Sequence, residues 1–145
     1  MKLKSEYGQI ILRISLSLVF LWFGINQVFA PSAWAGFVPS FLGNILPLNT
    51  IVLLNGSLEI LLGLMLITGF YTGVASLILG VHLFGIALSM GFSAIAIRDY
   101  GLALATISLL FMGPDKLCLD TKLKKKTSNS NNIPEENNPI VSASQ

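Results

Sequence analysis

The stretch TIVLLNGSLEILLGLMLIT, residues 50–68, decides the fold class of this protein. It contains a single charged side chain, Glu59, and is otherwise made mostly of leucine, isoleucine and valine. A helix needs about 20 apolar residues to cross the roughly 30 Å of hydrocarbon in a bilayer. The stretch therefore predicts a transmembrane helix that stops at Gly69 and carries a carboxyl group near its centre.

Three further apolar segments have the length of membrane helices. They cover residues 8–29, residues 72–92 and a region that ends at Gly113. The last segment begins either at Ser93, which gives a full span, or at Asp99, which gives a helix so short that the bilayer would have to thin around it. We expect an all-α fold, an integral membrane four-helix bundle over residues 1–120, with helices at about 8–29, 50–68, 72–92 and 93–113.

The composition excludes a soluble domain. Of the 145 residues, 53% are hydrophobic and 11% are charged, whereas about 25% of the residues in soluble domains are charged. The charged side chains between Tyr7 and Pro114 are Arg13, Glu59, Arg98 and Asp99. The net charge of +2 comes from lysines in the two flanks, so it does not indicate a nucleic-acid partner.

The distribution of Lys and Arg predicts the orientation in the membrane. Eight of these residues lie in the two terminal flanks, Arg13 included, and the remaining one is Arg98. Because basic residues favour the cytoplasmic side, four passes with both termini in the cytoplasm fit the pattern. A signal peptide cleaved at the small-x-small motif Ala33-Trp34-Ala35 is the alternative, but the apolar run is too long for one and Arg13 interrupts it.

Two segments outside the four spans have distinct compositions. The connection of residues 30–49 is uncharged and carries apolar side chains at roughly helical spacing, so we expect a short interfacial helix there with Trp34 at headgroup level. Residues 121–145 are rich in Lys, Asn, Ser and Pro and have little to bury. We expect a disordered basic and polar cytoplasmic tail that can rest on anionic lipid.

Polar side chains inside the apolar segments form the candidate ligand site. Glu59 at a helix centre is costly unless something offsets its charge, and His82 lies at the centre of the next segment. Glu59 is expected to touch His82 or Arg98. The whole predicted chamber consists of Asn26, Asn55, Glu59, His82, Arg98 and Asp99, and Gln27 can complete it.

Each of these residues also has a purely structural interpretation. His82 can donate to a serine or a backbone carbonyl of a neighbouring helix. Arg98 and Asp99 can form an interfacial ion pair that fixes a helix end. Arg13 belongs to a stripe of polar and small residues that should face the bundle, but its depth favours snorkelling to the cytoplasmic headgroups, a structural and interfacial role like that of Trp34.

Several kinds of redox chemistry are excluded for this chain alone. The sequence has one cysteine, Cys118, and one histidine, so it has no disulfide framework and no dithiol relay. It has no haem, zinc or nucleotide motif and no catalytic motif. Whether the protein is an enzyme is left open by the sequence.

Five pieces of the chain together resemble the DoxX family (DoxX/DoxD-like) of small four-helix membrane proteins. They are LRI at 12–14, FLWFGIN at 20–26, Pro31 with Trp34, NGSLEILLGL at 55–64, and IRDYGL at 97–102. The resemblance implies a place among proteins of the prokaryotic cytoplasmic membrane that are linked to small subunits of thiosulfate:quinone oxidoreductase. It also implies a link to membrane oxidoreductase complexes of thiol and oxidative stress, whose redox-active residues need not lie in this subunit.

Three functions compete at this point. The first is a subunit of a membrane oxidoreductase complex whose polar chamber takes a quinone-like or lipid-like ligand, with the bilayer and a soluble or membrane redox protein as partners. The second is a non-catalytic membrane anchor or assembly partner. The third is a small transporter, which is the weakest because small multidrug exporters carry their critical carboxylate on the first helix.

Overall fold

The computed structural model describes residues 2–121, which are helical apart from short connections. The elements in chain order are α1 (Lys2–Phe29), α2 (Pro31–Trp34), the 3₁₀ turns η1 (Ala35–Phe37) and η2 (Ser40–Asn44), α3 (Leu48–Thr68), α4 (Thr72–Ser89) and α5 (Ala94–Met112). Four helices are long and apolar enough to cross a membrane, namely Tyr7–Phe29 of α1, α3, α4 and α5. The predicted all-α fold with four long apolar helices, each a candidate membrane span, is therefore confirmed.

The helix boundaries decide where the fourth span begins and correct where the third one ends. The fourth span begins at Ala94, because Ser93 is its N-cap and its hydroxyl accepts the N–H of Ala96 at 3.1 Å. The third span stops at Ser89 and not at residue 92, because Gly91 turns the chain with a φ of 65°. The predicted tail lies outside the described residues, apart from Thr121.

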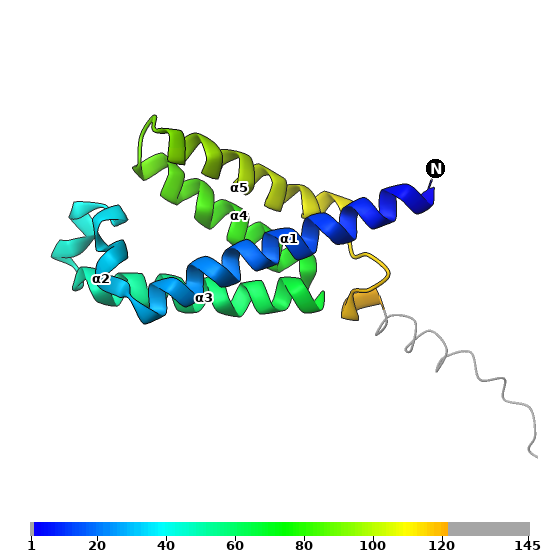
Figure 1. Cartoon of the computed structure of the whole chain (residues 1–145), viewed down its shortest axis with the longest axis horizontal. Coiled ribbons are helices and arrows are strands. Elements are labelled where there is room, and N and C mark those ends of the chain that lie inside the picture. The colour runs from blue at the N-terminus through cyan, green and yellow to red at the C-terminus, as the bar shows by residue number, and fades with distance from the viewer. Residues whose placement is uncertain (1, 122–145) are drawn as a thin grey trace, which may run out of the picture.

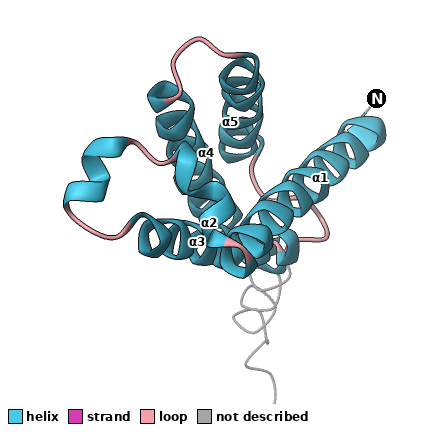
Figure 2. Cartoon of the chain, turned by 60° about the vertical axis from the view of Figure 1, so that its left-hand side comes forward, coloured by secondary structure: helices cyan, strands magenta, loops and turns pink. Residues whose placement is uncertain are grey.

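The bundle consists of two helix pairs, α1 with α3 and α4 with α5, that contact each other less extensively than their own members do. The pairs converge around the N-terminal half of α1, whose first turns project beyond the bundle, and diverge toward the end that carries α2 (Figures 1 and 2). Gly24 and Gly56 set the crossing of α1 and α3. A Cβ on Gly24 would lie 2.7 Å from the carbonyl oxygen of Gly56, and one on Gly56 would lie 2.8 Å from that of Gly24.

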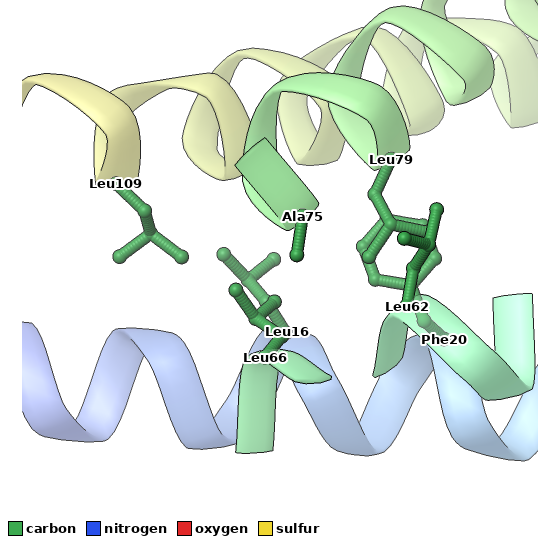
Figure 3. Packing of buried hydrophobic residues seen from close by; sticks show 7 residues of the cluster. All are labelled: Leu16, Phe20, Leu62, Leu66, Ala75, Leu79 and Leu109. Carbon is green, nitrogen blue, oxygen red and sulfur yellow. The ribbon is translucent and has the colours of Figure 1, made fainter. Parts of the chain in front are cut away.

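The hydrophobic core lies where the two pairs converge. Leu16 of α1 and Leu66 of α3 point toward Ala75 of α4 and Leu109 of α5 (Figure 3). Phe20, Leu62 and Leu79 continue this cluster toward the diverging end. Beyond them the pairs no longer fill the space between them, and this is where the cavity described below begins.

Arg13 closes the converging end, so the expectation that it snorkels to the headgroups is wrong. Its side chain is 2% exposed, with Nε 2.7 Å from Asp115 Oδ2 and Nη1 2.7 Å from the carbonyl oxygens of both Leu66 and Ile67. The last carbonyls of a helix lack intrahelical partners. The end of α3 and one carboxylate therefore form a polar pocket that holds the guanidinium inside the protein.

The chain after α5, residues 113–121, folds back over the α3–α4 turn, and we call this segment the clasp. Its Asp120 carboxylate accepts the backbone N–H groups of Tyr71 and Thr72 at 2.9 and 3.0 Å and so caps the start of α4. Gly69 has a φ of 72°, and a Cβ there would lie 2.5 Å from the Cα of Cys118. Burial raises the pKa of the Cys118 thiol.

Candidate functional site

A cavity of about 1040 Å³ lies between the two helix pairs at the diverging end. Its walls come from α1, α3, α4, α5 and the segment of residues 30–47, and most of them are apolar or aromatic. The polar side chains among its lining residues include Gln27, Asn55, Glu59, His82, Arg98 and Asp99. An apolar cavity with a few convergent polar groups is the usual form of a binding site for a small molecule.

Glu59 is the centre of the polar wall. Its side chain is buried, with the residue 3% exposed. Gln27 Nε2 donates to Oε2 at 3.1 Å, and Asn55 Nδ2 donates to Oε1 at 3.0 Å. Asn55 Nδ2 also lies 2.7 Å from Gln27 Oε1, so the two amides and the carboxyl group form a closed cluster between α1 and α3.

His82 connects α4 to this cluster. Its Nε2 donates to Asn55 Oδ1 at 2.5 Å, because an amide oxygen can only accept a hydrogen bond. His82 therefore reaches Glu59 through Asn55 and not directly. Asn55 faces three side chains on three helices, because it lies one helical turn before Glu59 on α3 and contacts both Gln27 of α1 and His82 of α4.

Arg98 and Asp99 form the wall contributed by α5. Arg98 Nε donates to Asp99 Oδ1 at 2.8 Å, with the Arg98 side chain 53% exposed and that of Asp99 9% exposed. The Arg98 guanidinium carbon also lies 5.9 Å from the ring centre of Phe23 on α1, which is the range of a cation–π contact. Arg98 and Asp99 thus form the ion pair that was given above as their structural interpretation.

The predicted chamber changes in two ways. Asn26 does not line the cavity, and its Nδ2 donates to the Trp22 carbonyl of its own helix at 2.7 Å. Glu59 hydrogen-bonds to neither of its expected partners, His82 and Arg98, and instead accepts from Gln27 and Asn55. Asn55, Glu59, His82, Arg98 and Asp99 do line one cavity, whereas their role in binding a ligand stays a prediction.

From the sequence we named Asn26 as a chamber residue and Gln27 only as a residue that can complete the chamber. We gave no role to Asp115 and Asp120, which follow α5. Helical periodicity could have ranked Gln27 first, since it lies three residues after Gly24, whose close approach to α3 fixes the buried face of α1. Asp115 also had a signal, because a guanidinium as deep as that of Arg13 requires a carboxylate at the same end of the bundle.

The arrangement offers both hydrogen-bond donors and acceptors to a ligand. Each oxygen of Glu59 accepts one amide N–H and retains a second lone pair. Within the described residues, Arg98 donates to Asp99 through Nε, so its two terminal amino groups have donors to offer another acceptor. A head group that carries both an acceptor oxygen and an O–H or N–H donor matches this wall.

Comparison with known proteins identifies one family. The family model described as DoxX matches residues 8–92, which is more than half of the chain. The matched region contains α1 from residue 8 onward, the segment between α1 and α3, α3 and α4, and so includes Gln27, Asn55, Glu59 and His82. No curated protein and no solved structure matches the chain.

Proposed function

The chain belongs to the DoxX family, and from this premise we propose that it is a subunit of a membrane oxidoreductase complex. In this proposal its cavity binds a quinone-like or lipid-like amphiphile. One observation carries the proposal: a large, mostly apolar cavity between candidate membrane spans is lined at the same time by the polar side chains of Gln27, Asn55, Glu59, His82, Arg98 and Asp99.

The cavity dimensions favour an amphiphile. Small-molecule pockets usually enclose about 300–1000 Å³, and this cavity, at about 1040 Å³, has room for a ring or head group together with part of an alkyl chain. The apolar walls would cover the chain of such a ligand. Glu59 would accept a hydrogen bond from a hydroxyl of the head group, and Arg98 would donate to an oxygen atom.

The oxidoreductase role rests on the family and requires a partner. The sequence holds a single cysteine, Cys118, which is buried in the clasp and does not line the cavity. We therefore assign the electron-transfer groups to a partner protein and assign to this chain the binding and orientation of the amphiphile.

A second function, that of a membrane anchor without a ligand, is favoured by a different observation. Among the described residues, every buried side-chain nitrogen or oxygen atom has a hydrogen-bond partner within the protein. The polar cluster around Glu59 therefore satisfies itself without a ligand, as expected of groups whose role is to hold membrane helices together.

Replacement of Glu59 by Gln distinguishes the two functions. Glu59→Gln keeps the shape of the side chain but replaces one acceptor oxygen by an NH₂ group, which then faces the NH₂ of Gln27 or Asn55. Hydrogen bonds to charged groups contribute about 1.5–3 kcal/mol, so we expect about tenfold less co-purified quinone or lipid per protein, with normal assembly.

The measurement is mass spectrometry of the native-membrane complex, combined with redox activity per recovered complex. Ser57→Ala is the matched control, since Ser57 lies two residues from Glu59 on the exposed side of α3 and bonds only to the Leu53 carbonyl. Wild-type ligand content and wild-type specific activity in Glu59→Gln would refute the ligand site. Equal losses of protein and of recovered complex, at constant specific activity, would support the anchor.

We also propose that both termini lie in the cytoplasm. Eight of the nine Lys and Arg residues belong to the terminal flanks, and basic residues are retained on the cytoplasmic side. The start of α1 and the clasp lie at the same end of the bundle (Figure 1). A reporter fused after Gln145 should be active on the cytoplasmic side only, and an external location would refute both the orientation and the even number of passes.

A further inference from the structure

Residues 30–47, which join α1 to α3, form one complete wall of the cavity. The side chains that they contribute are Trp34, Phe37, Val38, Pro39, Phe41 and Leu42. These residues lie in α2, the two 3₁₀ turns and their connections, so none of them belongs to a membrane span. Access to this side of the cavity therefore depends on where the segment lies.

The segment is attached to the bundle by few specific interactions. Its backbone hydrogen bonds are local, for example Val38 N to Ala35 O at 3.2 Å and Leu42 N to Pro39 O at 3.0 Å. In the described part of the chain, no side-chain hydrogen bond or ion pair joins residues 31–46 to another element. Pro31 and Pro47 bound the segment and lack the N–H groups that would extend a regular helical ladder across its ends.

The segment packs against α3 as well as α1, and its aromatic contacts lead to Phe23 of α1. The Phe23 and Trp34 rings pack edge to face with centroids 5.5 Å apart, and Trp34 is followed by Phe37 at 5.8 Å. The Arg98 guanidinium carbon lies 5.9 Å from the centre of the same Phe23 ring. Phe23 is thus the place where α1, the 30–47 segment and α5 meet.

The opposite edge of the segment is loosely packed against the α4–α5 connection. A second cavity, of about 370 Å³, lies between residues 36–39 and the group Ser89, Met90, Ser93 and Ile95. The large exposed apolar side chains of the segment that lie outside the cavity lining are Ile45, at 72%, and Leu46, at 42%. In a membrane these apolar side chains can remain in contact with lipid in either position of the segment.

We propose that residues 30–47 are a lid that opens the cavity to lipid by moving away from the α4–α5 connection. Phe23 is the latch that holds the lid closed through Trp34, and Arg98 fixes the Phe23 ring from the other side. The lid supplies the proposed amphiphile site with a route of entry, but its movement requires neither a redox partner nor an identified ligand. The two proposals can therefore fail separately.

The two tryptophans of the chain provide a direct reporter. In a Trp22→Phe background, Trp34 on the lid is the remaining tryptophan. The protein is placed in bilayers of phosphatidylcholine whose acyl chains carry bromine, which quenches tryptophan fluorescence on contact. Val38→Cys and Ser89→Cys, in a Cys118→Ser background, place one thiol on each side of the second cavity, and a short bis-maleimide joins them.

Linking the lid should lower the quenching of Trp34 by at least about twofold relative to the same protein before linking. Equal quenching before and after linking would overturn the proposal, because the lid would then not control contact between lipid and the cavity. The unlinked sample controls for any effect of the substitutions on folding. A lid that behaves as proposed in a protein that retains no quinone or lipid would refute the proposed function alone.

The latch is tested by amide hydrogen exchange across the lid. Phe23→Ala removes an aromatic pair and a cation–π contact, so exchange over residues 35–44 should rise about fivefold. Phe29→Ala is the matched control, because Phe29 lies on the same helix, is 84% exposed and lies outside the cavity lining. Equal exchange in both variants would overturn the role of Phe23.

Discussion

Arg13 at the clasp end and Arg98 at the cavity end are the two arginines of the chain, and their surroundings differ sharply. Arg13 is 2% exposed and meets one carboxylate and two backbone carbonyls. Arg98 has a side chain that is 53% exposed, donates to the adjacent Asp99 and faces the Phe23 ring. The first closes a packed core, whereas the second borders a cavity.

This difference separates polar groups that hold the bundle together from those that remain available to a ligand. The guanidinium of Arg13 is enclosed by protein acceptors at the end where the helix pairs converge. At the other end the pairs diverge, and Glu59 and Arg98 retain hydrogen-bonding capacity on the cavity side. In this bundle the tight packing is thus concentrated at one end, and the cavity lies at the other.

The largest expected effect is the loss of stability caused by Arg13→Gln. The glutamine can reach at most part of the site, so Asp115 and the α3 carbonyls lose partners while remaining buried. Removing one member of a buried ion pair costs about 3–5 kcal/mol. Thermal unfolding in detergent should therefore show a large drop in midpoint, and the amount of protein in the membrane should fall.

The labelling rate of Cys118 provides an independent measurement of how firmly the clasp is held. Its thiol is buried in the clasp beside Thr72, at an Sγ to Oγ1 distance of 3.5 Å, so it should react slowly with N-ethylmaleimide in the wild type. Arg13→Gln should accelerate this reaction, because the clasp loses its main attachment. A variant with wild-type midpoint and wild-type labelling rate would show that the ion pair does not hold the clasp.

The next largest effect concerns the crossing of α1 and α3. In Gly56→Ala the new Cβ would lie 2.8 Å from the Gly24 carbonyl oxygen and 2.9 Å from the Gln27 Cβ, so the two helices must separate. Overpacking of this kind costs about 1–3 kcal/mol. Gly101→Ala is the control, since nothing lies within 4 Å of a Cβ there. If both alanine variants melt like the wild type, the reciprocal glycine contact is not a constraint.

The stability of the protein at acidic pH should also depend on the clasp end of the bundle. Burial by itself raises the pKa of Asp115, but hydrogen bonds from Arg13 and the Leu117 amide, with the guanidinium charge, outweigh it and lower the pKa below 3.8. The ionised carboxylate therefore stabilises the fold at neutral pH, and this contribution is lost as the pH falls below 3.8 toward the folded pKa. Unfolding midpoints measured across that range should fall less steeply in Asp115→Asn than in the wild type.

The spans could be predicted from the sequence because each is a long apolar run bounded by residues that interrupt helices. The start of α5 was the one boundary that the sequence left open. Ser93 settled it as an N-cap, a role that depends on a local hydrogen bond and not on hydropathy. The fold-back of the clasp could not be predicted, since residues 113–121 lack a periodic pattern and are ordered by contacts with Arg13, Gly69 and the start of α4.

The candidate site was predictable as a set of residue types but not as a set of partners. Polar side chains near a membrane midplane must face protein, which brought Asn55, Glu59 and His82 to one cavity. Their pairing depends on helix rotation within a fraction of a turn, which is why Gln27 and not Asn26 reaches Glu59. The sequence also could not show that the helix pairs diverge and leave Arg98 at a cavity.

The smallest expected effect on stability belongs to Arg98→Gln, the counterpart of Arg13→Gln. An exposed ion pair contributes about 0–1 kcal/mol, and a glutamine at position 98 can still donate to the Asp99 carboxylate. The unfolding midpoint should stay near that of the wild type, whereas amide exchange in the lid should rise because the Phe23 ring loses its cation–π partner. The unfolding midpoint and the amide exchange of the lid are both measured for Arg98→Gln and for Arg13→Gln. A fall in midpoint as large as that of Arg13→Gln would mean that Arg98 also holds the bundle together, and the contrast between the two ends would then fail.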